Sequence, residues 1–184
     1  VVRVVTPGLR FDPDHLEARE NNFLAGLCRL EGVFGLACMD ISTGEFRVME
    51  IQDREILQAE LAGLSLRELI VPEDFEERQS LTILDKSEAP AAVNTFSGDY
   101  FDPEAARSLL ESYFPEAELT ALEMEKRPAV AGAAGAVLRY GEETQRERLA
   151  HVNRIQEMPW SQSLFLDETA KNTLELFQTI QERK

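Results

Sequence analysis

The chain has 184 residues, 43% of them hydrophobic, which is enough for one α/β domain with an attached segment. Its 34 acidic and 19 basic side chains give a net charge of −15, which excludes the broadly basic surface that a free-standing nucleic-acid-binding protein uses to displace counterions from phosphates. The two cysteines are too few for a disulfide framework or a zinc site, so we expect reduced thiols and a cytoplasmic protein. No apolar run approaches the roughly 20 residues of a membrane span and no signal peptide is visible, so we expect no membrane partner.

The first 20 residues predict the end of one domain and a connection to the next. Residues 1–8 form a short apolar run that a Pro-Gly pair stops, and residues 9–20 are polar and typical of a linker. The chain begins with Val1, and its first methionine is Met39. We therefore expect it to be a piece of a longer protein.

The stretch from residue 21 to residue 51 predicts three antiparallel strands. Apolar runs at 22–29, 33–40 and 45–51 are separated by two turn signals, Glu-Gly and Ser-Thr-Gly, so the runs form a β-meander. Both faces of the middle run are apolar, and helices should therefore cover both sides of the sheet.

After the meander the chain alternates between helical and extended patterns. Apolar residues at helical spacing predict a helix over 54–64, and an apolar run closed by proline predicts a short buried strand over 67–72. Residues 73–93 are acidic and irregular, with one more strand predicted at 81–84. We expect the acid-rich segments 73–77 and 116–125 to be solvated surface.

The clearest helix is predicted over 103–114. Asp102 is a good N-cap, Pro103 suits the first helical position, and apolar residues follow at the spacing i, i+3, i+4, i+7, i+8. Pro115 ends the helix. Its polar face carries four side chains: Arg107, Ser108, Glu111 and Ser112.

Three further segments complete the chain. Residues 127–145 predict a helix rich in small residues, and residues 146–163 are typical of a linker that crosses the surface. Residues 164–184 predict a strand-like start followed by a helix that Asp167 caps, and the apolar stripe of this helix has no following helix to pack against. We therefore expect the C-terminal segment to be the first helix of a truncated neighbouring domain.

An enzymatic interpretation depends on Asp40. Metal-dependent nucleases of the ribonuclease H-like fold use several carboxylates that converge on two metal ions. The first of these carboxylates lies in the middle of the first strand. In this chain the predicted first strand, 22–29, carries no acidic residue. Asp40 instead ends the second strand, two residues before Ser42, where it can accept hydrogen bonds from the turn while Gly44 supplies a positive φ. We therefore interpret Asp40, Ser42 and Gly44 as a structural turn.

Other candidate sites have weaker patterns. The glycines of residues 131–136 lack the Gly-Lys pair of a P-loop and the spacing of a dinucleotide loop, and close helix packing explains them more simply. Cys28 and Cys38 are too few for a zinc site, and the expected register places Cys28 opposite Gly35, so both should be free thiols. We therefore predict no catalytic residue, cofactor site or metal site in this chain.

Six segments are informative when they are taken in chain order. They are VVRVVTPG, ENNFLAGL, FGLACMDISTGEFRV, LRELIVPE, AGAVLRYGEETQ and FLDETAKNTLEL. In this order the chain resembles the bacterial MutS family of DNA mismatch-repair proteins over essentially its whole length. It departs from the family pattern at Leu9, Gly141 and Thr173, so the parent is either a mismatch-repair MutS or a divergent paralogue.

The resemblance implies a ribonuclease H-like α/β fold, with a mixed sheet flanked by helices and no catalytic carboxylates. Residues 1–20 would end the preceding domain and form a linker, residues 21–145 would be the connector domain, and residues 146–184 would be a linker and the first helix of the lever domain. In this family, other domains of the protein recognise the mismatch and carry out Mg²⁺-dependent ATP hydrolysis. ATP and mismatched DNA would therefore be bound by the intact parent and not by this chain alone. The connector would relay conformational change between the mismatch-binding and ATPase domains, and would offer a docking surface to the partner MutL.

The polar face of the predicted 103–114 helix is the candidate docking surface, with Arg107, Ser108 and Glu111 exposed. An ordinary solvated helix face would carry the same residues. Two other function classes stay open: a metal-dependent nuclease of ribonuclease H-like fold, and an unrelated small-molecule enzyme. Magnesium- or manganese-dependent cleavage of an RNA–DNA hybrid would reveal the first, and a ligand thermal-shift screen would reveal the second.

Overall fold

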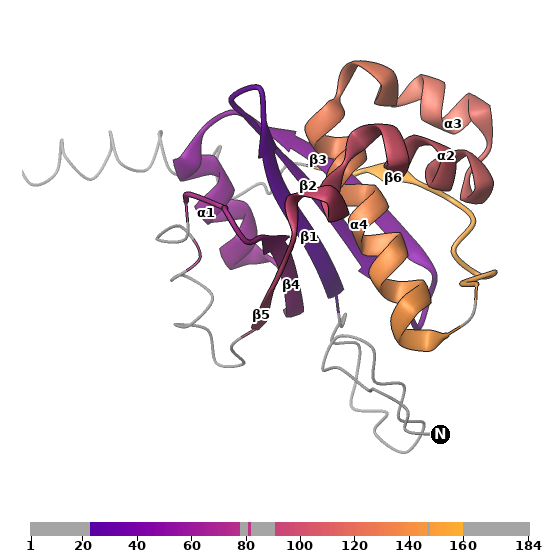
Figure 1. The fold of residues 1–184 in the computed structure, drawn as a ribbon, viewed down its shortest axis with the longest axis horizontal. Helices are drawn as coiled ribbons and strands as arrows, with labels where there is room; N and C mark the ends of the chain where they lie inside the picture. Colours follow the sequence, from indigo (N-terminus) through magenta and orange to yellow (C-terminus); the bar gives the residue numbers. More distant parts are fainter. Residues whose placement is uncertain (1–22, 78–80, 82–90, 147, 160–184) are drawn as a thin grey trace, which may run out of the picture.

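The sheet is built around an antiparallel meander, and its order is β5-β4-β1-β2-β3-β6 (Figure 1). The structure is a computed structural model that describes residues 23–77, 81, 91–146 and 148–159. The strands of the described part are β1 (Phe23–Leu30), β2 (Val33–Asp40), β3 (Glu45–Ile51), β4 (Leu66–Pro72), β5 (Ala92–Phe96) and β6 (Gln156–Glu157). Strands β1, β2 and β3 pair antiparallel, whereas β4 with β1, β5 with β4, and β6 with β3 pair parallel. The mixed sheet that the sequence predicts is confirmed.

Turn residues set the register of the meander. Glu31 and Gly32 have φ values of 52° and 87°, and Gly44 has a φ of 75°, which is the left-handed region that tight hairpins use. With these turns in place, Cys28 pairs with Gly35, and the meander strands lie within one residue of their predicted ranges. The cysteines are therefore buried free thiols that do not face each other.

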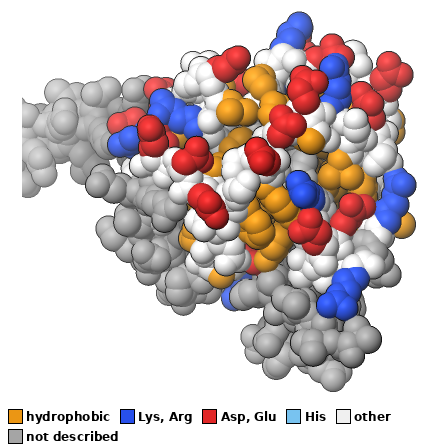
Figure 2. Space-filling view, in the orientation of Figure 1, with side chains coloured by type: hydrophobic (Ala, Val, Ile, Leu, Met, Phe, Trp, Pro, Cys, Tyr) orange, Lys and Arg blue, Asp and Glu red, His pale blue; other side chains and the backbone are white. Residues whose placement is uncertain are grey.

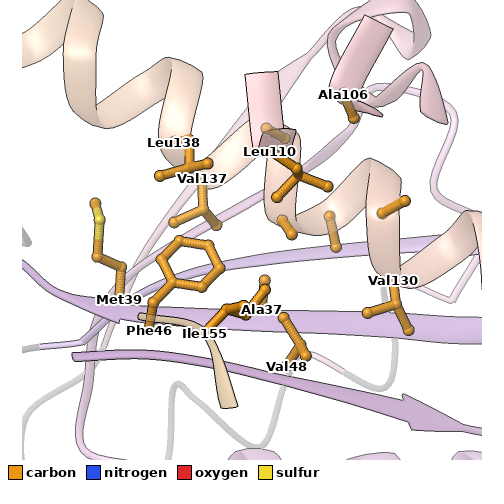
Figure 3. Close-up of a cluster of buried hydrophobic side chains, with 14 of the residues drawn as sticks. Ala37, Met39, Phe46, Val48, Ala106, Leu110, Val130, Val137, Leu138 and Ile155 are labelled. Atoms are coloured by element: carbon orange, nitrogen blue, oxygen red, sulfur yellow. The ribbon is translucent and has the colours of Figure 1, made fainter. Parts of the chain in front are cut away.

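Helices cover both faces of the sheet, as predicted from the apolar character of both faces of β2. The helices are α1 (Arg54–Gly63), α2 (Pro103–Tyr113), α3 (Glu116–Ala121) and α4 (Pro128–Gln145), with the short 3-10 turns η3 (Gly98–Phe101) and η4 (Met124–Lys126). One buried cluster joins α1 to one face, and a second joins α4 and α2 to the other. Figure 3 shows this second cluster, in which Val130 and Val137 of α4 point toward Ala37, Phe46 and Val48 of the sheet. None of the described helices is long and apolar enough to cross a membrane.

Glycines allow α4 to lie unusually close to its neighbours. A Cβ atom on Gly35 of β2 would stand 2.0 Å from the carbonyl oxygen of Ala129. On the other side of α4, a Cβ on Gly132 would stand 2.4 Å from a backbone oxygen before α2, and one on Gly135 would stand 2.3 Å from the Cβ of Ala106. The sheet, α4 and α2 are therefore interlocked at backbone distance, which no larger residue at these positions permits.

The described residues 148–159, which follow α4, differ from the surface linker predicted over 146–163. Four apolar side chains in this segment are buried, with at most 3% of their surface exposed: Leu149, Val152, Ile155 and Met158. The segment also adds β6 to the sheet, where the Met158 N–H donates to the Val48 carbonyl at 2.7 Å. Arg127 at the start of α4 fixes it further, because its guanidinium donates to both carboxylate oxygens of Glu157, at 2.7 and 2.9 Å.

Some predicted elements lie outside the described residues. These are the strand-like run at 1–8, the linker at 9–20 and the C-terminal helix at 164–184. Of the strand predicted at 81–84, only Leu81 is described, and it is buried. In contrast, β5 was missed because its first residues fall in the stretch interpreted as irregular.

Candidate functional site

Asp40 closes the turn between β2 and β3. It is buried, with 3% of its surface exposed, and its Oδ1 accepts hydrogen bonds from the Ser42 backbone N–H at 2.8 Å and the Ser42 hydroxyl at 2.6 Å. The Gly44 N–H donates to the Asp40 carbonyl at 2.9 Å. His151 lies against the same turn, with its Nε2 2.6 Å from the Ile41 carbonyl oxygen. The carboxylate oxygen is thus occupied by its own turn, in the geometry of an Asx-type turn.

Two buried acids elsewhere, Glu68 and Glu77, take part in packing. Glu68 of β4 has none of its surface exposed, and its carboxylate accepts hydrogen bonds from the Tyr140 hydroxyl at 2.5 Å and the Asn94 side-chain amide at 2.6 Å. These bonds tie α4 and β5 to β4. Glu77 pairs with Arg29 of β1. Within the described ranges, no group of three or more His, Cys, Asp or Glu side chains could hold a metal ion.

Both thiols lie in apolar surroundings. Burial raises the pKa of Cys28 and of Cys38 to about 12. The Cys28 Sγ–H donates to the Ala129 carbonyl oxygen at 3.2 Å. Since the thiolate is the nucleophilic form, these side chains are unreactive near neutral pH.

The outer face of α2 carries the predicted docking residues. The helix begins as predicted, because the Asp102 carboxylate accepts hydrogen bonds from the backbone N–H groups of the first turn. Arg107, Ser108 and Glu111 are exposed on this helix. The Arg107 guanidinium lies 3.5 Å from the Glu111 carboxylate and also pairs with Glu125 of η4. The structure therefore links this face of α2 to η4, a contact that helical spacing alone does not indicate.

A cleft of about 690 Å³ lies beside α2, and we call it the α2–α3 cleft. It is bounded by α2, α3, η4 and the first residues of α4. Its lining consists of Pro103, Glu104, Arg107, Leu110, Glu111, Glu116, Leu119, Thr120, Glu123, Met124, Glu125, Lys126, Pro128 and Ala131. The mixture of apolar and acidic groups recurs on the molecular face in Figure 2, where acidic side chains lie between hydrophobic patches.

The far side of this cleft was missed by reasoning from sequence. The acid-rich stretch 116–125 predicts solvated surface, but Leu119 and Leu122 pack against the core, and Met124 is 7% exposed. The apolar residues between the acids were the sequence signal that this segment is partly buried, because a fully solvated segment gains nothing from leucine and methionine side chains.

Comparisons with known proteins identify similar sequences. A family model described as MutS domain II matches residues 22–153. The chain is similar to proteins named DNA mismatch repair protein MutS from three bacteria. It is 33% identical to that of Desulfatibacillum aliphaticivorans, over 98% of this chain and 20% of the relative. It is 33% identical to that of Myxococcus xanthus, over 99% and 20%, and 34% identical to that of Desulforapulum autotrophicum, over 98% and 21%. The chain thus spans about a fifth of the length of these curated relatives.

Proposed function

Because this chain belongs to the MutS family of DNA mismatch-repair proteins and matches its domain II over residues 22–153, we propose that it is the connector module of a MutS-type ATPase. It relays conformational change between the mismatch-binding and ATPase domains and offers a docking surface to a MutL-type protein. The chain itself performs no catalysis. ATP, Mg²⁺ and mismatched DNA are ligands of the intact parent, which acts in the cytoplasm.

The proposed relay is supported by one observation, the close packing of α4 against both the sheet and α2. Backbone atoms of α4 approach Gly35 on one side and the start of α2 on the other so closely that neither layer can slide without breaking contacts. A block of this kind moves as one body, and rigid-body displacement is an established way to carry a change from one domain to another. A nucleotide can bias DNA contact by this route because the two states differ in the contacts between domains.

Two fluorescence distances in the intact parent test the relay. One pair of dyes, on cysteines replacing Glu55 of α1 and Ser112 of α2, reports the inside of the block, since these exposed residues lie on its opposite sides. A second pair joins the Ser112 position to the ATPase domain. We expect ATP to change the second distance in the mismatch-bound protein and to leave the first constant. A change within the first pair would refute rigidity, and constancy of both would refute the relay.

Charge reversal on α2 tests the docking role. The Arg107→Glu variant of the intact parent should recruit less MutL-type protein in a pull-down and should keep its ATPase rate, because Arg107 lies on the surface of α2. Arg139→Glu is the matched control, since Arg139 is also about half exposed and also pairs with a glutamate one helical turn away, on α4. Undiminished recruitment by Arg107→Glu would count against this face.

A further inference from the structure

The α2–α3 cleft has the dimensions of a binding site for a side chain and its neighbours. Its volume of about 690 Å³ falls within the range typical of ligand sites. We call four buried or partly buried apolar residues of the lining its floor: Leu110 and Met124, which are 2% and 7% exposed, together with Leu119 and Ala131. An apolar floor of this kind favours a bulky apolar side chain, which removes its own surface and that of the floor from water.

The rim of the cleft is acidic. Five glutamates line it: Glu104, Glu111, Glu116, Glu123 and Glu125. The two cations in the lining are already engaged, since Arg107 pairs with Glu111 and Glu125, and Lys126 pairs with Glu123. Among the described residues, Glu104 and Glu116 form no ion pair. The rim therefore attracts cations and repels phosphates.

We propose that the α2–α3 cleft binds a short basic segment of a partner protein. One bulky apolar side chain of that segment lies on the floor, and flanking lysine or arginine side chains pair with the rim glutamates. The inference goes beyond the docking function proposed above, although Arg107 and Glu111 of the predicted docking face also line this cleft. Because Arg107→Glu removes a cation that pairs with two rim glutamates, it should leave the binding of a basic segment undiminished, whereas a partner that docks on Arg107 itself should bind less. Charge complementarity determines the class of partner: a basic polypeptide satisfies both the floor and the rim, whereas a nucleic acid satisfies neither.

A peptide titration of the 184-residue chain tests the chemistry of the cleft directly. The probe is a Gly/Ser-based peptide with a central phenylalanine and two lysines on each side. One matched peptide carries glutamates in place of the lysines, and another carries serine in place of the phenylalanine. We expect the probe to shift amide NMR signals of α2, α3 and η4, and to bind at least about tenfold more tightly than either matched peptide, a difference of about 1.4 kcal/mol. Equal binding of the serine peptide, or shifts spread over the whole surface, would overturn the proposal.

Matched charge variants separate a site from general attraction to an acidic protein. Glu116→Lys changes the rim of the cleft, and Glu55→Lys makes the same change on exposed α1 across the sheet. The first should weaken probe binding by at least about fivefold, and the second by less than about twofold. Equal weakening by both would overturn the proposal, and the amide spectra of both variants report that they are folded.

The outcomes also distinguish the two proposals. If the intact parent recruits a MutL-type protein but the peptide shows no preference for the cleft, the cleft inference fails and the docking function stands. If the peptide binds the cleft but the parent recruits no MutL-type protein, the docking function fails and the chemistry of the cleft stands.

Discussion

Replacement of Gly35 by alanine tests the packing on which the relay depends. Gly35 lies on β2 beneath the first turn of α4, and a Cβ atom there would stand 2.0 Å from the carbonyl oxygen of Ala129, 2.1 Å from its carbonyl carbon and 2.5 Å from the nitrogen of Val130. Ordinary contact begins near 3.4 Å, so α4 must move away by about 1.4 Å. All three obstructing atoms belong to the backbone, and no side-chain rotation relieves the clash.

The expected cost follows from what holds α4 in place. Overpacking a core costs about 1–3 kcal/mol and occasionally more. We expect the upper end, about 3 kcal/mol, because Ala129 and Val130 are fully buried and α4 is held from the other side through Gly132 and Gly135. Since domains are stable by only about 5–15 kcal/mol, this loss is a large share of the total.

Urea unfolding followed by far-UV circular dichroism measures the loss. With a slope of about 1–3 kcal/mol per molar urea, the midpoint should fall by about 1–3 M. Gly63→Ala is the matched control, because no atom lies within 4 Å of a Cβ at that position, and alanine at the end of α1 should be neutral or stabilise by up to about 1 kcal/mol. A Gly35→Ala midpoint within about 0.3 M of the wild type would refute the interlock.

Four further predictions concern buried polar groups. Asp40→Ala should lower the free energy of unfolding by about 1–2 kcal/mol in the same urea assay, because it removes the acceptor of two turn hydrogen bonds, while Asp40→Asn, which keeps an acceptor, should cost less than half as much. Tyr140→Phe should cost about 1–3 kcal/mol in thermal unfolding, because it removes a hydroxyl donor from the buried carboxylate of Glu68. Cys28 and Cys38 should resist a thiol reagent at pH 8 in the native protein and react promptly in urea, because burial raises the pKa of both to about 12. Stability should also fall as the pH rises from about 9 toward 12, since the unfolded thiols, with a pKa near 8.5, release their protons first.

Each of these predictions has a result that contradicts it, and for the pH dependence that result is a free energy of unfolding that stays constant from about pH 9 to 12. Equal losses for the two Asp40 variants would mean that the side-chain acceptor is not what holds the turn. A Tyr140→Phe variant as stable as the wild type would mean that the remaining partners of Glu68 satisfy its carboxylate. Rapid labelling of Cys28 or Cys38 in the native protein would show that the core around them opens readily.

The meander and the larger helices were predictable because local signals and tertiary packing agree there. The turn glycines Gly32 and Gly44 have the positive φ that hairpins require, and the alternating apolar residues of β2 do bury on both faces. In α2, the Asp102 cap, the following proline and the apolar stripe all indicate the same start and the same buried face. The family resemblance is also confirmed by the match to MutS domain II, while the ribonuclease H-like description of the fold stays a prediction.

The segment after α4 was not predictable from periodicity. Its buried side chains recur at every third position, from Leu149 to Met158, and this spacing matches neither the period of two of a strand nor the 3.6 of a helix. These side chains are buried because they pack against the sheet and α4, which lie outside the segment. No local pattern in the segment therefore predicts their burial.

The cleft was hidden for a related reason. The chain reverses between α3 and η4 at Glu123, which has a φ of 50° although glutamate carries no signal for the left-handed region. Without the left-handed backbone at Glu123, Leu119 and Met124 would not line the same cleft. Arg107 and Glu111 could be placed on an exposed helix face from spacing alone, but the wall opposite them depends on tertiary structure.

The pairing of β6 with β3 sets a lower limit on the length of a recombinant chain worth expressing. A chain that stops at Gln145, where α4 ends, would lack Val152 and Ile155, which are buried, and would lack β6, the outer neighbour of β3. Strands exposed in this way recruit other chains and lead to aggregation. A chain that extends past Met158 keeps these residues and β6, so the end of α4 is a poor guide to where a recombinant chain should stop.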